Sequence, residues 1–376
     1  MFYMKKVILG VIVAVLIAGI IIARNAKQNA SPLSNPDNKP VVKIGAQFAL
    51  TGNMTDYSII VRNALVKSIE DANNNPENKL HYELLIEDHQ GDMRSANSIA
   101  YRFISVDKVN VLVDDLGSIA RVTAPLAAKN KIPSFHHAYG SGFLNSKHNF
   151  KSLPTNDAVA EGIVRLLDSK GIKNVTMTIQ SIGSGDEIAD LLSQKLQHSG
   201  ITFSIERFNP TERDLNILVG KIKNRAAEAV VAMAYPPALN ILAREFNRQK
   251  IDKPIVLFAS AGFMYGSNKN LFDGMYVADA LQPSVSLRKH LGFNENENAP
   301  LVAFFYDTGT FITQAFEKAY DGVNIPTGDE VSDQLLSQKE YQGYQEVYTL
   351  DERGQFLSKV EIYIVKDGKL VPVMGD

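Results

Sequence analysis

Residues 109–140, VNVLVDDLGSIARVTAPLAAKNKIPSFHHAYG, carry the clearest indication of the fold. VNVLV is a short β-branched run that predicts a buried parallel strand, and residues 119–130 have helical spacing. A second strand begins at Ile132 and stops at the loop HHAYG. The stretch therefore predicts one βαβ unit. Because open α/β sheets bind ligands at the carboxyl ends of their strands, a site is expected at the loops LGS and HHAYG.

The same alternation extends on both sides of this unit. Upstream, residues 41–48 and 81–88 are predicted strands, and residues 58–72 and 95–105 are predicted helices. A second run of this kind begins near residue 156, with the predicted strands NVTMTIQ, ITFSIERF, AVVAMAY and PIVLFAS. The end of the chain, residues 344–373, predicts a β-meander. The pattern indicates two consecutive α/β lobes built on doubly wound parallel sheets.

Composition excludes several classes of function. The chain has 376 residues with a formal net charge of −2, enough length for two hydrophobic cores. No dense basic stripe with interleaved aromatic residues is present, so no nucleic-acid partner is expected. Cysteine is absent, which excludes disulfides, thiolate metal sites, a cysteine nucleophile and a lipid-modified cysteine.

The N-terminus predicts export or membrane attachment. Lys5 and Lys6 precede the uninterrupted apolar run 7–23, and Arg24 closes it. The run just reaches the length of a spanning helix, and no small-x-small cleavage site follows, so an uncleaved anchor is favoured over a cleaved signal. Residues 25–40 are a polar linker. Either reading places the body outside the cytoplasmic membrane.

An ordered series of segments carries a family resemblance. Residues 41–58, 83–104, 124–133 (APLAAKNKIP) and 354–373 are similar, in that order, to segments of the type I periplasmic solute-binding proteins of ABC transporters. Within that group the chain resembles the branched-chain amino-acid (leucine/isoleucine/valine) binding family. The resemblance covers about residues 41–373.

The resemblance implies two Rossmann-like lobes joined by three crossovers, with a ligand held between them. The boundaries expected are 1–24 for the signal or anchor, 25–40 for the linker, 41–156 plus 280–331 for lobe 1, and 157–279 plus 332–376 for lobe 2. In such proteins the ligand contacts both lobes only when the hinge closes, so binding stabilises the closed state.

The resemblance also implies ligand contacts in the loops. Gly117 and Ser118 match the position where a hydroxyl and backbone N–H groups hold a carboxylate, a chemistry that suits a helix N-terminus. The alternative for Ser118 is an ordinary helix cap. Tyr57 and Tyr235 match tyrosines that offer an aromatic wall and a hydroxyl, although Tyr57 fits a packing role equally well.

Three departures from the family pattern weaken the prediction of an amino-acid ligand. In HHAYG, Ala138 and Gly140 match ligand positions, but Gly140 lacks the usual threonine hydroxyl, and His136 and His137 are new polar groups. An imidazole there could donate a hydrogen bond or become charged at mildly acidic pH. The alternative is one histidine packed inward and one solvated.

The other departures lie in the second lobe. Ile182 stands where the family has a ligand-facing tyrosine. Ser260, with Ala261, stands where amino-acid binders carry an acid for the ammonium, which needs a countercharge when buried. Asp186 or Glu187 could replace that acid, but both fit a helix start more simply.

These residues favour a non-enzymatic extracytoplasmic receptor that passes a small polar ligand, an amino acid or a related amide or carboxylate, to an ABC permease. The alternative is a membrane-tethered sensor or assembly module of the same fold that acts through a protein partner. An enzyme is disfavoured because no nucleophile–base set can be assembled. No cofactor and no metal are expected.

Overall fold

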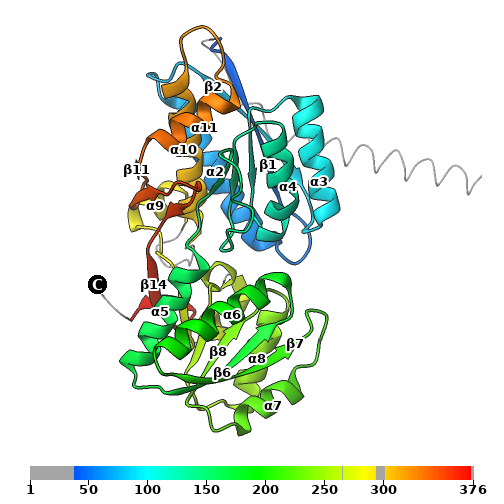
Figure 1. Ribbon diagram of the computed structural model, residues 1–376, viewed down its shortest axis with the longest axis vertical. Coiled ribbons are helices and arrows are strands. Elements are labelled where there is room, and N and C mark those ends of the chain that lie inside the picture. The colour runs from blue at the N-terminus through cyan, green and yellow to red at the C-terminus, as the bar shows by residue number, and fades with distance from the viewer. Residues whose placement is uncertain (1–37, 265, 294–300, 374–376) are drawn as a thin grey trace, which may run out of the picture. The chain divides into compact units, whose positions relative to one another are not determined.

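A computed structural model describes residues 38–264, 266–293 and 301–373, and it confirms the predicted α/β fold with parallel sheets (Figure 1). The predicted anchor at residues 7–23 lies outside these residues. No helix within the described ranges is long and apolar enough to cross a membrane.

Five strands form the first sheet, in the order β2-β1-β3-β4-β5, and all neighbours are parallel. The strands are β1 (Val41–Phe48), β2 (His81–Asp88), β3 (Val111–Asp114), β4 (Ser134–His136) and β5 (Asn149–Lys151). Helices on the two sides are α2 (Thr55–Asn74) with α10 (Val302–Ala319), and α3 (Met93–Arg102) with α4 (Gly117–Lys129) (Figure 1). A π-helical turn, Phe103–Asp107, follows α3. We call this part the first lobe.

Strand β1 is buried on both faces, which explains why its sequence is almost continuously apolar. Ile44, Ala46 and Phe48 are fully buried. At Gly45 a side chain would meet the ring of Phe103 at 2.8 Å, so only glycine lets the π-helical turn pack this closely. With both faces covered, the carboxyl ends of the strands are where the sheet can meet a ligand.

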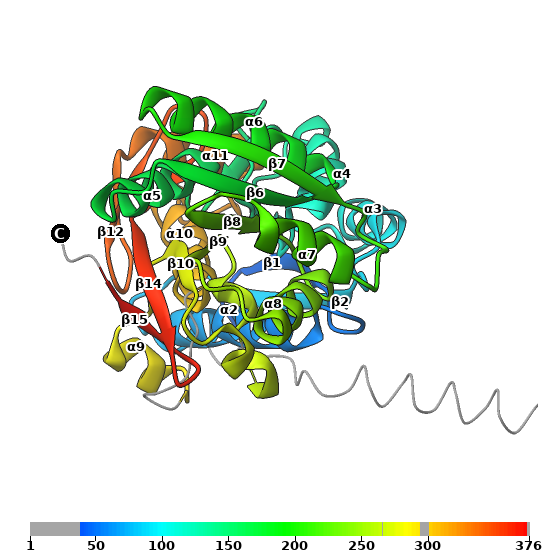
Figure 2. The ribbon, with the colours of Figure 1, turned by 90° about the horizontal axis from the view of Figure 1, so that it is seen from below.

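The second sheet has seven strands in the order β15-β14-β10-β9-β8-β6-β7. Its parallel strands are β6 (Asn174–Gln180), β7 (Thr202–Phe208), β8 (Ala229–Met233), β9 (Ile255–Phe258) and β10 (Tyr276–Ala280). The antiparallel edge is β14 (Val360–Lys366) and β15 (Lys369–Pro372). Figure 2 shows α5 (Asn156–Ser169) and α6 (Gly183–His198) on one face, and α7 (Asn216–Asn224) and α8 (Ala238–Gln249) on the other. We call this part the second lobe.

A third, small sheet packs on the first lobe. It consists of β11 (Glu340–Gln342), β12 (Val347–Leu350) and β13 (Phe356–Leu357), and it follows α11 (Gly328–Ser337). The ring of Phe356 stacks on Phe311 at 4.8 Å and on Phe135 at 6.2 Å between centroids. The lobe boundaries stay a prediction, but these contacts favour counting residues 340–357 with the first lobe.

The chain passes between the two large sheets at three places: after β5, after β10 and before β14. Polar side chains form hydrogen bonds between these three connecting segments. Lys151 Nζ is fully buried and donates to Leu153 O at 2.8 Å and to Gln355 Oε1 at 2.8 Å. Tyr363 donates to Ala280 O at 3.0 Å. The second passage leads into the short helix α9 (Val285–His290).

Helix α6 begins inside a glycine-rich segment. The segment SIGSGDE, residues 181–187, has the composition of a loop, but α6 begins within it at Gly183. A side chain at Gly185 would lie 2.2 Å from Gln180 O at the end of β6. The glycine therefore permits the helix to begin directly against the strand end.

Candidate functional site

A cavity of about 840 Å³ lies at the carboxyl ends of strands from both lobes. In the first lobe, the segments after β1, β2, β3 and β4 line it. In the second lobe, the segments after β6 and β8 line it. This is the edge at which parallel α/β sheets bind ligands. We call this cavity the cleft.

Most of the predicted site residues line the cleft. Those that do are Tyr57, Gly117, Ser118, His137, Ala138, Gly140, Ile182 and Tyr235. His136 and Ser260 are absent from the lining, and both are fully buried. The hydroxyl of Ser260 donates to Phe258 O at 2.8 Å, within its own turn.

The two adjacent histidines have different surroundings because successive side chains of a strand point to opposite faces. His136 Nδ1 lies 2.8 Å from Asp114 Oδ2, and its Nε2 lies 2.9 Å from Ser134 Oγ. The ring of His137 stacks on Phe305, with 3.5 Å between centroids, and its Nε2 lies 3.0 Å from Thr308 Oγ1. Neither ring is solvated, contrary to the packing alternative.

Burial also decides the charge of His137. Desolvation lowers the pKa of this imidazole to about 4, and the hydrogen bond to Asp114 O only partly opposes that effect. The suggestion that a histidine of this loop becomes charged at mildly acidic pH is therefore wrong for His137. It offers the cleft a neutral aromatic ring.

Ser118 does not cap its helix. Helix α4 begins at Gly117, its N-cap is Leu116, and no side chain caps it. Ser118 is instead exposed in the first turn and lines the cleft. The first N–H groups of a helix have no helical carbonyl to bond, so this turn can accept an anion. A side chain at Gly117 would lie 3.2 Å from Ala138 Cβ, so the two predicted loops touch.

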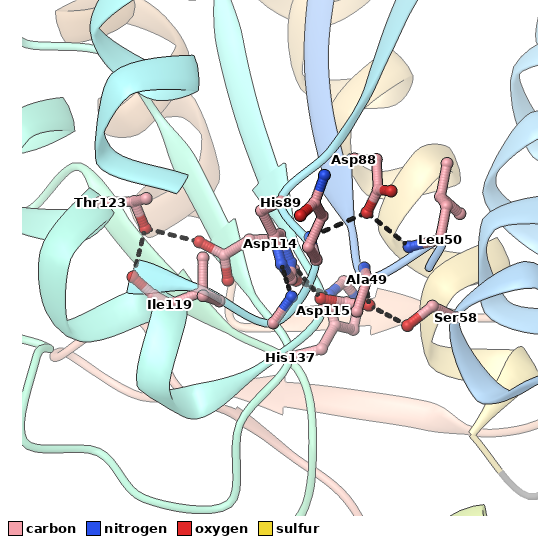
Figure 3. Close-up of polar contacts among 12 residues, drawn as sticks. Ala49, Leu50, Ser58, Asp88, His89, Asp114, Asp115, Ile119, Thr123 and His137 are labelled. Carbon is pink, nitrogen blue, oxygen red and sulfur yellow. Dashed lines mark hydrogen bonds and ion pairs between the residues drawn. The ribbon is translucent and has the colours of Figure 1, made fainter. Parts of the chain in front are cut away.

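Asp115, which the sequence analysis did not select, fixes the surrounding loops (Figure 3). Its carboxylate accepts from Ser58 Oγ at 2.5 Å and from Ala49 N at 3.2 Å. It also lies 2.8 Å from His89 Nε2. Because His89 Nδ1 accepts from Gly91 N at 3.0 Å, the ring proton is on Nε2 and is donated to Asp115. Asp115 borders the cleft, but its acceptors serve protein donors.

Asp88 orders the first loop in the same way. Leu50 N donates to its Oδ1 at 2.9 Å, and Thr51 Oγ1 donates to its Oδ2 at 2.7 Å. The sequence EDHQGD therefore holds a carboxylate that positions a loop. Within the described ranges, no group of three or more histidine and acidic residues could hold a metal ion.

Tyrosines from both lobes form part of the cleft wall. Tyr57 donates to Asp115 O at 3.4 Å. Tyr235, whose side chain is hydrogen-bonded to Ser184, has its pKa raised to about 12 by burial. Tyr139, which the sequence analysis missed between Ala138 and Gly140, donates to the fully buried carboxylate of Asp279.

The charged groups that are exposed in the cleft form a pair across it. Arg121 of α4 lies 3.1 Å from Glu187 of α6, and each side chain is about half exposed. Glu187 is one of the two acids considered as a replacement for the missing ammonium partner. Asp186, the other, pairs with Arg207. The remaining lining is largely apolar and aromatic.

Comparisons with known proteins agree with this architecture. The family model described as "Periplasmic binding protein" matches residues 41–369. A leucine-binding protein from Thermotoga maritima MSB8 is 18% identical, with a TM-score of 0.78, covering 89% of this chain and 98% of that one. A search of curated protein sequences found no match.

Two solved complexes are similarly related. The branched-chain amino acid transporter substrate-binding protein of Streptococcus pneumoniae, in complex with isoleucine, is 16% identical with a TM-score of 0.77, covering 89% of this chain and 100% of that one. An ABC-transporter solute-binding protein of Rhodopseudomonas palustris BisB5, in complex with 3,4-dihydroxybenzoic acid, is 17% identical with a TM-score of 0.77, covering 89% and 96%. At these identities the likeness establishes the fold.

Proposed function

Because this chain belongs to the periplasmic binding protein family, we propose that it is an extracytoplasmic receptor for a small carboxylate, which it delivers to an ABC permease. The ligand binds in the cleft, and closure of the two lobes around it stabilises the bound state. The protein acts by binding and release and catalyses no reaction.

The observation that carries this proposal is the exposed first turn of α4 inside the cleft. Ser118 and the backbone of Gly117 line the cavity at a helix N-terminus, where a carboxylate is favoured by both hydrogen bonding and the helix dipole. Arg121, one turn further along α4, adds positive charge, although it is paired with Glu187. The carboxylate group therefore belongs at this turn.

The lining also supports an apolar or aromatic body for the ligand. The cleft wall includes the rings of Tyr57, Tyr139, Tyr235 and His137. The position expected to hold an acid for an ammonium is Ser260, which is buried and turned into its own loop. A buried ammonium without a countercharge is costly. These features favour a carboxylic acid over a standard α-amino acid.

A thermal-shift screen of the full chain tests the proposal. The panel holds aromatic and branched aliphatic carboxylates, the matching amides, amino acids and short peptides. A carboxylate should raise the melting temperature, and the rise should grow with its concentration, reaching about 5 °C near a hundredfold excess over Kd. The matching amides should produce a smaller shift. A preference for amides or amino acids would contradict the carboxylate proposal.

The variant Ser118→Asp separates an effect on ligand affinity from an effect on the stability of the protein. A carboxylate in the first turn of a helix stabilises the helix but repels an anionic ligand. The variant should keep its melting temperature and lose at least tenfold in affinity. Asn216→Asp is the matched control, since Asn216 is in the first turn of α7 and does not line the cleft. Equal losses in both variants would place the ligand elsewhere.

The same screen addresses the alternative of a membrane-tethered sensor or assembly module. Such a module would show no stabilisation by any solute of the panel and would co-purify with a protein partner. Cross-linking in cells that contain the permease then identifies the partner. A cross-link to a protein other than a permease, with no solute shift, would favour the alternative.

A further inference from the structure

Tyr139 and Asp279 form a buried contact between the cleft and the second lobe. Tyr139 belongs to the loop after β4 of the first lobe and lines the cleft. Its hydroxyl donates to Asp279 Oδ1, on the strand that leaves the second lobe. The carboxylate of Asp279 is fully buried and lies outside the cleft lining. Tyr139 therefore contacts both this acid and the cavity.

The hydrogen-bond pattern fixes the direction of this contact. Asp279 also accepts from Ala261 N at 2.7 Å and from Ala280 N at 2.7 Å. Burial raises the pKa of Asp279 to about 6, so at pH 8 it is a carboxylate and can only accept. Burial, and then the nearby Asp279 charge, raise the pKa of Tyr139, so the phenol keeps its proton. The phenol therefore donates this proton to Asp279.

This arrangement leaves the phenol oxygen of Tyr139 as an acceptor. A tyrosine hydroxyl has one proton and can accept as well as donate. Because the phenol proton is donated to Asp279, Tyr139 can offer a ligand only an oxygen lone pair. Chains of hydrogen bonds polarise one another, so the bond to a carboxylate strengthens this acceptor.

From this geometry, and resting on the proposed function, we propose that Tyr139 is a specificity-determining residue that accepts a hydrogen bond from a ligand hydroxyl. The cleft then selects hydroxylated carboxylates over the same acids without the hydroxyl. A neutral hydroxyl fits better than an ammonium, because Asp279 is already occupied by donors from Tyr139, Ala261 and Ala280. A ligand ammonium would lack a direct countercharge.

Isothermal titration of the full chain at pH 8 tests this proposal. The probes are benzoate, its three hydroxybenzoate isomers, leucine and the deaminated analogue 4-methylpentanoate. At least one hydroxybenzoate should bind wild type about tenfold more tightly than benzoate, which corresponds to about 1.4 kcal/mol. Tyr139→Phe should reduce that ratio to near one.

Tyr348→Phe is the matched control. Tyr348 also donates to a buried aspartate, Asp307, at 2.9 Å, but it lies outside the cleft lining. This variant removes the same atom from the same kind of pair and should keep the tenfold preference. If Tyr139→Phe fails to fold, Asp279→Asn replaces it. That variant should also lower the ratio, because a neutral amide polarises the phenol less.

The outcomes separate the two proposals. A wild-type protein that binds benzoate and all hydroxybenzoates equally overturns the role of Tyr139 and leaves the carboxylate receptor standing. A preference that survives Tyr139→Phe has the same meaning. If the protein binds leucine more tightly than 4-methylpentanoate and shows no preference for hydroxylated acids, the role of Tyr139 is overturned in favour of an ammonium site. Binding of none of these acids overturns the role of Tyr139, while the carboxylate receptor is then decided by the wider thermal-shift panel.

Discussion

The protein contains two buried tyrosine–aspartate pairs with nearly the same chemistry. Tyr139 donates to Asp279, and Tyr348 donates to Asp307. Burial raises the pKa of each carboxyl to about 6. Each carboxylate also accepts backbone N–H groups, such as that of Tyr344 at 2.7 Å for Asp307.

The two pairs differ in what surrounds the tyrosine. The ring of Tyr348 packs against aromatic rings of α10 and the small sheet, including Phe304, Phe311 and Phe356. The ring of Tyr139 borders the cleft. A buried acid with a raised pKa is therefore not sufficient evidence of a binding site. The neighbouring cavity turns one of two similar pairs into a candidate for ligand recognition.

Removing either carboxyl group should produce the largest effect on stability. Asp279→Ala leaves at least three buried donors without an acceptor, and Asp307→Ala leaves at least two. Each substitution should lower the free energy of unfolding at pH 5 by about 3 kcal/mol, with the larger loss for Asp279→Ala. Urea unfolding measures both. Losses below about 1 kcal/mol would contradict the hydrogen bonding described here.

The free energy of unfolding should depend on pH in a similar way for the two pairs. The size of this change should be somewhat smaller than the loss caused by the alanine substitutions. Because burial raises each pKa from an ordinary value of 3.8 to about 6, the folded state keeps a proton that the unfolded state has lost. The stability contribution of each acid therefore falls as the pH rises from 4 to 6. Asparagine does not titrate, so Asp307→Asn and Asp279→Asn should each gain on the order of 2 kcal/mol relative to wild type between pH 4 and 7.

Urea unfolding of the three proteins across this range checks the sign. His137, whose pKa is lowered to about 4, contributes with the opposite sign, but it is common to all three proteins and cancels in the comparison. A variant that loses stability relative to wild type as the pH rises would contradict this prediction, because it would show that ionisation of the aspartate stabilises the fold.

The smallest effect is expected for the exposed pair in the cleft. Arg121 and Glu187 are about half exposed, unlike the buried pairs. Exposed ion pairs contribute little and are screened by salt, so Arg121→Ala should change the free energy of unfolding by less than about 0.5 kcal/mol. Urea unfolding at low and high salt measures this change. A loss comparable to that of Asp307→Ala would mean that this pair holds the lobes together.

The fold was largely predictable because its signals are local. β1 and β2 begin and end at the predicted residues, and the loops after β3 and β4 line the cleft as the strand pattern indicated. Strand-end side chains were harder to place. Which of His136 and His137 borders the cleft depends on the register of a three-residue strand, which no periodicity fixes.

The pairing of Tyr139 with Asp279 was not predictable because the two residues are distant in sequence. Tyr139 and Asp279 are 140 residues apart, and although Tyr139 lies in the loop HHAYG, no sequence pattern pairs it with Asp279. One signal was present: Asp279 is a carboxylate within the apolar strand YVADA, and a buried acid requires donors. The sequence cannot show that the donor is a tyrosine of the other lobe.

A crystal structure of the full chain, grown with the carboxylate that stabilises it most, would show directly where the ligand binds. We expect the carboxylate of the ligand to lie within hydrogen-bond distance of the backbone nitrogen of Gly117 or Ser118. We also expect a hydroxyl of the ligand to lie within hydrogen-bond distance of the Tyr139 oxygen. A ligand bound outside the cleft, or one with its carboxylate directed away from α4, would contradict these expectations.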